Sequence, residues 1–218
     1  VCSSDLYLGN SYRIAGGMKY TILSDNIGYV YYEDFSRAVG EGNLDEMLAY
    51  FAPCNGIIFD VRDNGGGTLT YAERIAARFT NEKVHTGYIM HKTGPGHNQF
   101  SQPKPVYVES SNRIRWQKPV AVLTNRSAYS TTNEFANIML YMPNAVLIGD
   151  RTGGGAGLPF TSELPNGWGV RFSASPHLDA EKNHIEFGIE PDIKIDLTSL
   201  TLHDDIIEEA RKTLKNMQ

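Results

Sequence analysis

The sequence predicts an α/β fold in which a largely parallel sheet is flanked by helices. Two short apolar runs, 56–62 and 145–149, have the composition of strands that are buried on both faces, as the strands of parallel sheets are. Stretches with apolar residues at helical spacing alternate with such runs along the chain. Alternating strands and helices are typical of a layered α/β domain.

The first half of the chain supplies a pair of strands and two strand-to-helix transitions. Its predicted elements are strands at 20–23 and 27–32, a helix at 43–52, a strand at 56–62 and a helix from 69 to 79. Asn43 has the chemistry of a helix N-cap. The glycine-rich "DNGGG" at 63–67 breaks the chain sharply between the strand and the helix that comes after it.

The second half repeats this pattern and adds a hairpin. Its predicted elements are strands at 84–90 and 119–124, a helix at 132–142, a strand at 145–149 and a C-terminal helix within 201–217. A long polar loop separates the first two strands. Asn166-Gly167, between two β-prone segments, predicts a β-hairpin.

Composition excludes several classes of function. The 218 residues carry a formal net charge of −5, so the chain lacks the basic surface that nucleic-acid binding requires. No apolar run is long enough to span a membrane. The two cysteines, Cys2 and Cys54, and the spacing of the histidines match no metal-binding motif. We therefore expect no metal, no cofactor and no nucleic-acid partner.

The first six residues, "VCSSDL", differ in character from the rest of the chain. They match what the end of a common sequencing adapter encodes, which indicates a non-native remnant on a truncated gene. The alternative is a leader remnant, with a mature lipoprotein beginning at Cys2. In either case we expect natural sequence upstream of residue 7 to be missing, including a possible N-terminal domain.

The hydroxyl-rich stretch "SAYSTTNEF", 127–135, has two interpretations. Thr131 with Glu134 fits a capping box at the start of a buried helix, which needs no catalysis. Alternatively, Ser130 comes after a buried strand and precedes a helix N-terminus, where free amides and the helix dipole stabilise negative charge. The second setting suits a nucleophile with an oxyanion site built from backbone amides.

Three motifs in a fixed order resemble those of the S41 serine peptidases, the C-terminal processing or tail-specific protease family. They are "FDVRDNGGG" at 59–67, "PVAVLTNRSAYSTTNEFANIM" at 119–139 and "VLIGDRTGGG" at 146–155; "FGIEPDI" at 187–193 resembles the family's closing motif. The resemblance implies a ClpP/crotonase-like layered fold with a mostly parallel sheet. It divides the chain into residues 1–6, a peptidase core at 7–200 that is incomplete at its N-terminus, and a C-terminal helix at 201–218.

The resemblance implies a role for individual residues. Ser130 is the nucleophile, and the amides of Gly66 and Thr131 form the oxyanion hole. Gly155 stands where the processing branch has its lysine base, so the serine-lysine pair is missing. The tricorn-like or retinoid-binding-protein-like branch instead implies a histidine from an upstream domain, with Glu186 as an orienting carboxylate.

Two histidines of the chain itself, His177 and His184, are local substitutes for this base, although surface positions on a turn are the simpler expectation for both. The predicted function is hydrolysis of polypeptides through a Ser130 acyl-enzyme. The alternatives are an inactive peptide-binding module of the same fold and, less favoured, a crotonase-like acyl-thioester enzyme. The family resemblance also implies a cell-envelope location, whether periplasmic, lipid-anchored or secreted.

Overall fold

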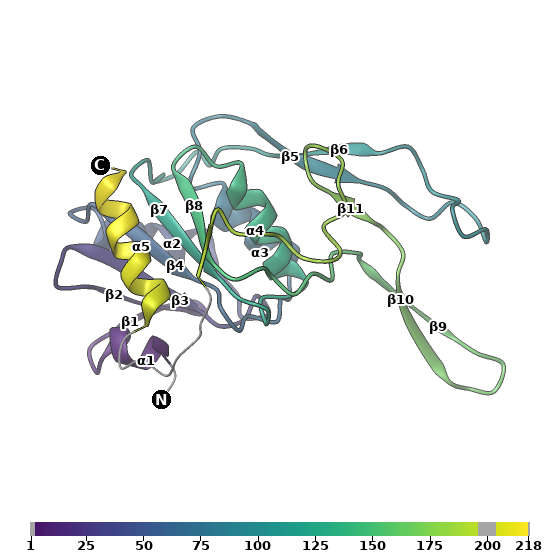
Figure 1. The fold of residues 1–218 in the computed structure, drawn as a ribbon, viewed down its shortest axis with the longest axis horizontal. Helices are drawn as coiled ribbons and strands as arrows, with labels where there is room; N and C mark the ends of the chain where they lie inside the picture. The colour runs from purple at the N-terminus through teal and green to yellow at the C-terminus, as the bar shows by residue number, and fades with distance from the viewer. Residues whose placement is uncertain (1–2, 196–203, 218) are drawn as a thin grey trace.

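A seven-stranded mixed sheet forms the body of the protein (Figure 1). The computed structural model describes residues 3–195 and 204–217. The strands are β1 (Arg13–Ala15), β2 (Met18–Ile22), β3 (Ile27–Tyr32), β4 (Gly56–Asp60), β7 (Val120–Thr124), β8 (Ala145–Gly149) and β12 (Ile193–Lys194). Their order is β1-β2-β3-β4-β7-β8-β12, and every pairing from β3 to β12 is parallel. The carboxyl ends of β4, β7 and β8 therefore meet at one edge of the body.

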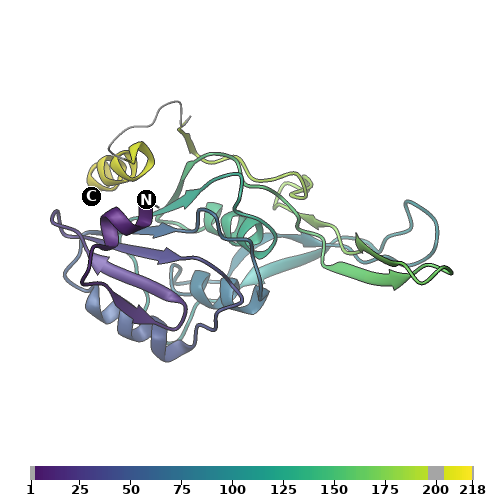
Figure 2. The same ribbon diagram turned by 90° about the horizontal axis from the view of Figure 1, so that it is seen from below.

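Helices cover both faces of this sheet (Figure 2). The helices α2 (Glu41–Tyr50), α3 (Leu69–Ala76) and α4 (Thr131–Leu140) pack on one face. The helix α5 (Asp205–Asn216) lies on the other face, and α1 (Ser3–Leu8) adds Leu8 to the same apolar cluster.

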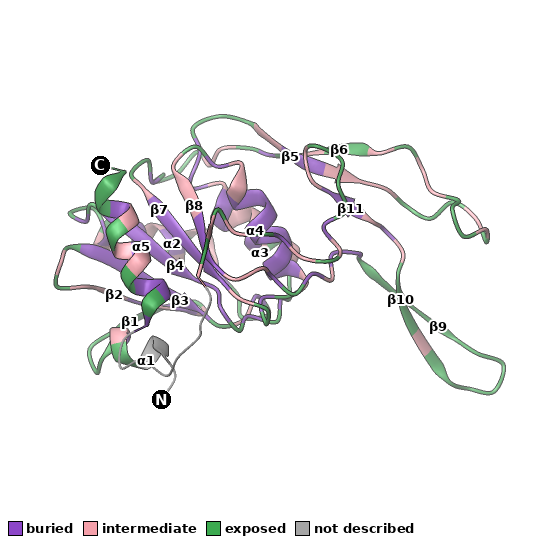
Figure 3. Cartoon of the chain, in the orientation of Figure 1, coloured by how far each residue is buried: buried purple, intermediate pink, exposed green. Residues whose placement is uncertain are grey.

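The core is divided into two layers by the sheet, because alternate residues of a strand point to opposite faces. In β4, Ile57 and Phe59 belong to the cluster beneath α2, α3 and α4, whereas Ile58 packs with α5. The whole of β4 and β7 is buried, as Figure 3 shows by colour. The apolar composition of both strands is explained by this double burial.

Two β-arms extend from one side of the body (Figure 1). The first is a three-stranded sheet of β11 (His177–Leu178), β5 (Val84–Ile89) and β6 (Lys104–Val108). The second is a two-stranded hairpin of β9 (Pro159–Glu163) and β10 (Gly169–Ser173), which we call the β9–β10 arm. The β9–β10 arm follows the loop after β8 and so begins at the carboxyl edge of the parallel strands.

The predicted α/β architecture with a mostly parallel sheet flanked by helices is confirmed, and differences are local. The helix predicted at 43–52 begins at Glu41 and its N-cap is Gly40; Asn43 instead accepts a hydrogen bond from the Gly40 amide at 2.9 Å. The long loop between β5 and β7 contains the unpredicted strand β6. Residues 201–203 of the predicted C-terminal helix, and residues 1–2 of the predicted non-native or leader remnant at 1–6, lie outside the described residues.

Candidate active site

Loops from three neighbouring parallel strands converge at the carboxyl edge of the sheet. The loop after β4 holds Asn64, whose carbonyl oxygen accepts the Tyr129 amide at 3.0 Å. The loop after β7 holds Ser130, whose amide donates to the Gly154 carbonyl in the loop after β8 at 2.8 Å. The three predicted motifs are therefore joined by backbone hydrogen bonds around Ser130.

Ser130 occupies a backbone conformation that residues with side chains rarely adopt. Its φ is 58° and its ψ is −120°, directly before the first residue of α4. Such a conformation costs on the order of 1–3 kcal/mol for a non-glycine residue and persists only where the surroundings impose it. Among the described residues, no group forms a hydrogen bond with the Ser130 hydroxyl.

The predicted capping box at the start of α4 is wrong. Ser130 is the N-cap by position, yet its side chain makes no capping hydrogen bond within the described part of the chain. The Thr131 hydroxyl donates to the Gly67 carbonyl at 2.7 Å, and the Glu134 carboxylate contacts His177. The hydroxyl cluster thus holds the loops together, and the Ser130 hydroxyl stays available for another role.

The two amides predicted to hold an oxyanion, those of Gly66 and Thr131, differ in whether they already donate a hydrogen bond within the described residues. A Cβ built on Gly66 would lie 2.8 Å from Ser130 Cβ and 2.9 Å from the Thr131 nitrogen, so glycine permits this close approach. The Gly66 amide donates to Asn64 Oδ1 at 2.9 Å. The amides of Thr131 and Gly67, by contrast, find no acceptor among residues 3–195 and 204–217.

Gly155 cannot be replaced by a lysine without moving its neighbours. Its φ is 81°, and a Cβ built there would lie 2.2 Å from Cζ of the Tyr129 ring. The Tyr129 ring, next to Ser130 in the sequence, therefore occupies the space into which a side chain at 155 would project. A lysine at this position would clash with the ring.

His177 is buried, contrary to the expectation of a surface histidine. It is 6% exposed, and its Nδ1 lies 2.9 Å from Oε2 of Glu134, which is 7% exposed. Its other ring nitrogen, Nε2, is buried with no partner among the described residues. The pKa of Glu73 is raised above its ordinary value, first by burial and then by the charge of Glu134. His184 is exposed, as predicted.

Glu186 lies beside the loop that contains Gly155, and no hydrogen bond within the described chain joins it to Ser130. Its backbone carbonyl accepts the Gly155 amide at 2.9 Å, and its carboxylate accepts the Ser173 hydroxyl at 3.1 Å. Its side chain is half-buried at the base of the β9–β10 arm. Of the predicted residues, the structure brings Ser130, Thr131 and Gly66 together and places Glu186 behind the loop that contains Gly155.

Three hollows meet at Ser130. The helix-side pocket, about 250 Å³, includes Leu69, Glu134 and His177. The glycine-side groove, about 640 Å³, includes Glu33, Asp34, Arg37 and Asp63. The hairpin-side pocket, about 230 Å³, is lined by Tyr129, Ser130, Gly155, Pro159, Arg171, Phe172 and Ser173. Ser130 and Arg171 line all three hollows.

Buried polar residues that the motif analysis did not single out hold the loops in place. Asn64 is fully buried; its amide donates to the Tyr32 carbonyl at 2.7 Å and its Oδ1 also accepts the Thr132 hydroxyl at 2.7 Å. Asn133 accepts the Thr152 hydroxyl at 2.6 Å. The signal in the sequence was the run of polar residues from Thr131 to Glu134 at the start of a helix, all of which are buried.

The chain belongs to peptidase family S41: the sequence model of this family matches residues 26–195. A candidate peptidase from Parabacteroides merdae has the same fold, with 58% identity, a TM-score of 0.93, and coverage of 97% of this chain and 68% of the other. The carboxyl-terminal-processing peptidase 2 of Arabidopsis thaliana chloroplasts is 28% identical over 176 residues, which are 78% of this chain and 32% of that protein.

Mature CPAF, solved with lactacystin, shares the fold at 15% identity, with a TM-score of 0.70 and coverage of 91% of this chain and 53% of the other. The chain spans between 19% and 32% of the length of the curated relatives that it matches. The family membership supports a peptidase role.

Two further observations concern cofactors and membranes. Within the described ranges, no three His, Cys, Asp or Glu side chains are grouped so that they could hold a metal ion. None of the helices in the same ranges combines the length and the apolar character that crossing a bilayer requires.

Proposed function

We propose that this chain is the catalytic part of a serine-type peptidase in which Ser130 attacks the scissile carbonyl of a polypeptide. The observation that carries the proposal is the placement of Ser130. It stands in a strained conformation at the N-terminus of α4, borders three hollows, and has a hydroxyl that no described residue engages. Strain of this kind concentrates at functional sites.

Backbone amides would stabilise the tetrahedral oxyanion. The Thr131 amide is free of acceptors in the described chain and lies at the positive end of the α4 dipole. The Gly66 amide, which donates to Asn64 Oδ1, supplies the second donor if a substrate oxyanion displaces that oxygen. The Gly67 amide supplies it if the hydrogen bond between Gly66 and Asn64 is kept. Each donor typically contributes about 10²–10³ in rate. Water then resolves the acyl-enzyme.

A histidine is the base that this proposal requires, because Gly155 and Tyr129 leave no room for a lysine. One source is an upstream domain, with Glu186 orienting the ring. The other is His177, which borders the same pocket as Ser130 and has its Nδ1 fixed by Glu134, leaving Nε2 without a partner in the described chain. A carboxylate on Nδ1 selects the tautomer that accepts a proton at Nε2.

A fluorophosphonate probe tests this proposal on the purified chain. We expect an adduct at Ser130, mapped by mass spectrometry, that is absent in Ser130→Ala. Ser127→Ala is the matched control, because Ser127 is an exposed hydroxyl in the same loop. Labelling that persists in Ser130→Ala, or that is lost in Ser127→Ala, would contradict the assignment.

The base is located by the same reaction. Labelling that is lost in His177→Gln while the fold is retained would assign the base to His177. Labelling that needs a longer natural chain, in contrast, would assign it to an upstream segment.

A second candidate is a peptide-binding module that retains the fold without catalysis. The observation in its favour is that no group among the described residues forms a hydrogen bond with Ser130 Oγ, while His177, which lines the same pocket, is buried and paired with a carboxylate. Absence of labelling in both this chain and its full-length natural form, with peptide binding retained, would establish this alternative.

The family resemblance supports two further parts of the proposal, the site of cleavage in the substrate and the location of the protein. The substrate would be a polypeptide cleaved close to its C-terminus, and the protein would act in the cell envelope. Both are inferred from similarity to processing peptidases, and fractionation of cells that produce the full-length protein would test the location.

A further inference from the structure

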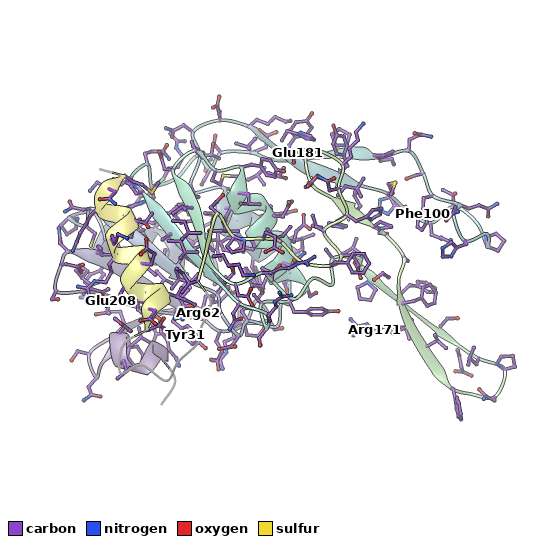
Figure 4. The ribbon with its side chains drawn as sticks, in the orientation of Figure 1. Tyr31, Arg62, Phe100, Arg171, Glu181 and Glu208 are labelled. Atoms are coloured by element: carbon purple, nitrogen blue, oxygen red, sulfur yellow. The ribbon has the colours of Figure 1, made fainter. Side chains whose placement is uncertain are left out.

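Arg171 lies opposite the nucleophile without an intramolecular role. It is exposed in β10, directly across the hairpin from Thr161, and its side chain points from the β9–β10 arm toward the body (Figure 4). Within the described residues, its guanidinium forms no hydrogen bond or ion pair. An exposed arginine that borders all three hollows around Ser130 is therefore free to contact a bound molecule.

The charges of the three hollows differ. Three carboxylates and Arg37 line the glycine-side groove with Arg171, and Glu134 faces His177 in the helix-side pocket. The hairpin-side pocket contains no acidic residue, and Arg171 is the one charged side chain among those that line it. The lining side chains of this pocket thus carry one positive charge, and the carboxylate that the structure places beside them, that of Glu186, already accepts the Ser173 hydroxyl at 3.1 Å.

We propose that Arg171 and the hairpin-side pocket bind a carboxylate of the polypeptide substrate within a residue or two of the scissile bond. This inference rests on the proposed peptidase function and names a recognition element for it. Arginine pairs with carboxylates through two parallel N–H donors, which gives orientation as well as affinity. The Tyr129 hydroxyl, in the same pocket, has no partner among the described residues and can add a third donor.

Two sources can supply this carboxylate. One is the free C-terminus of a polypeptide, and the other is an aspartate or glutamate side chain near the scissile bond. Because Ser130 and Arg171 line the same hollow, and an extended chain advances about 3.3 Å per residue, a carboxylate at this arginine fixes the register of the peptide at the nucleophile.

Equilibrium binding to the Ser130→Ala chain tests the inference without requiring catalysis. Three fluorescent peptides of one sequence are compared by anisotropy: one with a free C-terminus, one amidated, and one amidated with a glutamate near its end. We expect the free or the glutamate-bearing peptide to bind tighter than the neutral one. The peptide that does so identifies the source of the carboxylate.

The arginine is tested by adding Arg171→Gln to Ser130→Ala. We expect affinity for the carboxylate peptide to fall roughly five- to tenfold, with the neutral peptide unchanged and Arg171→Lys intermediate. Arg115→Gln, an exposed arginine outside the three hollows, is the matched control. Equal binding of all three peptides, no binding of any, or equal losses in Arg171→Gln and Arg115→Gln would overturn the inference.

Failure of this inference and failure of the proposed function are distinguishable. Fluorophosphonate labelling of Ser130 without a carboxylate preference would leave the peptidase in place and remove the role of Arg171. A carboxylate preference that depends on Arg171, in a protein whose Ser130 is never labelled, would leave a peptide-binding site without the chemistry.

Discussion

At the scale of single residues, the site depends on backbone conformations that only particular residue types tolerate. Gly155 has a φ of 81°, and the Tyr129 ring fills the space that its side chain would need. Tyr129 precedes Ser130 and lines the hairpin-side pocket with it. Because Gly155 has no side chain, the Tyr129 ring can occupy this space.

We therefore expect Gly155→Ala to destabilise the protein by about 1–3 kcal/mol, because the positive φ and the contact with Tyr129 both become unfavourable. Urea unfolding monitored by circular dichroism measures this difference. Gly169→Ala is the control, since Gly169 lacks a positive φ and no atom lies within 4 Å of a Cβ built there. Similar losses for the two variants would contradict the explanation.

Some residues of the site can be predicted from the sequence and others cannot. Ser130, Thr131 and Gly66 could be placed together, because each belongs to a glycine turn or a helix start in a recognisable motif. Asn64 and His177 could not, because their importance depends on partners that are 68 and 43 residues away in the chain. A buried polar contact of this kind leaves no periodic pattern in the sequence.

At the scale of elements, α4 connects the body to the first β-arm through buried polar contacts. The Glu134 carboxylate contacts His177 in β11, and the Asn137 amide donates to the Thr86 carbonyl in β5 at 2.9 Å. These contacts lie on one face of the helix because residues three or four apart are neighbours there. The arm is thus fixed to the helix that follows Ser130.

Removing one partner of the Glu134–His177 pair should loosen this arm. We expect Glu134→Leu to cost about 1–3 kcal/mol, because it leaves a buried His177 nitrogen without a partner. The double variant Glu134→Leu/His177→Phe should cost less than the sum of its two single variants. Hydrogen exchange in β5 and β11 measures the loosening, and strictly additive costs would contradict a direct coupling.

The elements that sequence periodicity missed are short or contain proline. β6 includes Pro105, which is unusual within a strand, and β11 and β12 are two residues long. Such segments become strands only because a neighbouring strand offers a pairing edge. The buried strands β4, β7 and β8 were predictable because their apolar runs are continuous.

At the scale of the whole molecule, a buried charge network joins the C-terminal helix to the strand that precedes the glycine turn. Arg62 is 6% exposed; its Nη2 lies 2.6 Å from Asp60 Oδ2 and its Nη1 lies 2.7 Å from Asp204 Oδ2. The Tyr29 hydroxyl also donates to Asp60 at 2.8 Å. Figure 4 places Arg62 beside α5 and far from the β9–β10 arm.

Asp204 has two separable roles, since it pairs with Arg62 and also accepts the amides of Ile206 and Ile207 at the start of α5. Asp204→Asn keeps a capping oxygen and removes the charge, whereas Asp204→Ala removes both. We expect the alanine variant to lose about 0.5–2 kcal/mol more than the asparagine variant, which is the typical contribution of an N-cap.

Thermal unfolding of the two variants, with Asp205→Asn as the exposed neighbouring control, measures this difference. Equal effects of all three substitutions would show that α5 does not depend on the buried contact.

The strand order has a consequence for solubility. A sheet of seven strands would present two long rows of unpaired amides and carbonyls, which template edge-to-edge aggregation. Here the outermost strands β1 and β12 contain three and two residues, so neither outer edge is long enough to recruit another chain. The described outer strands of this wide sheet are therefore too short to offer another chain a long row of unpaired backbone groups.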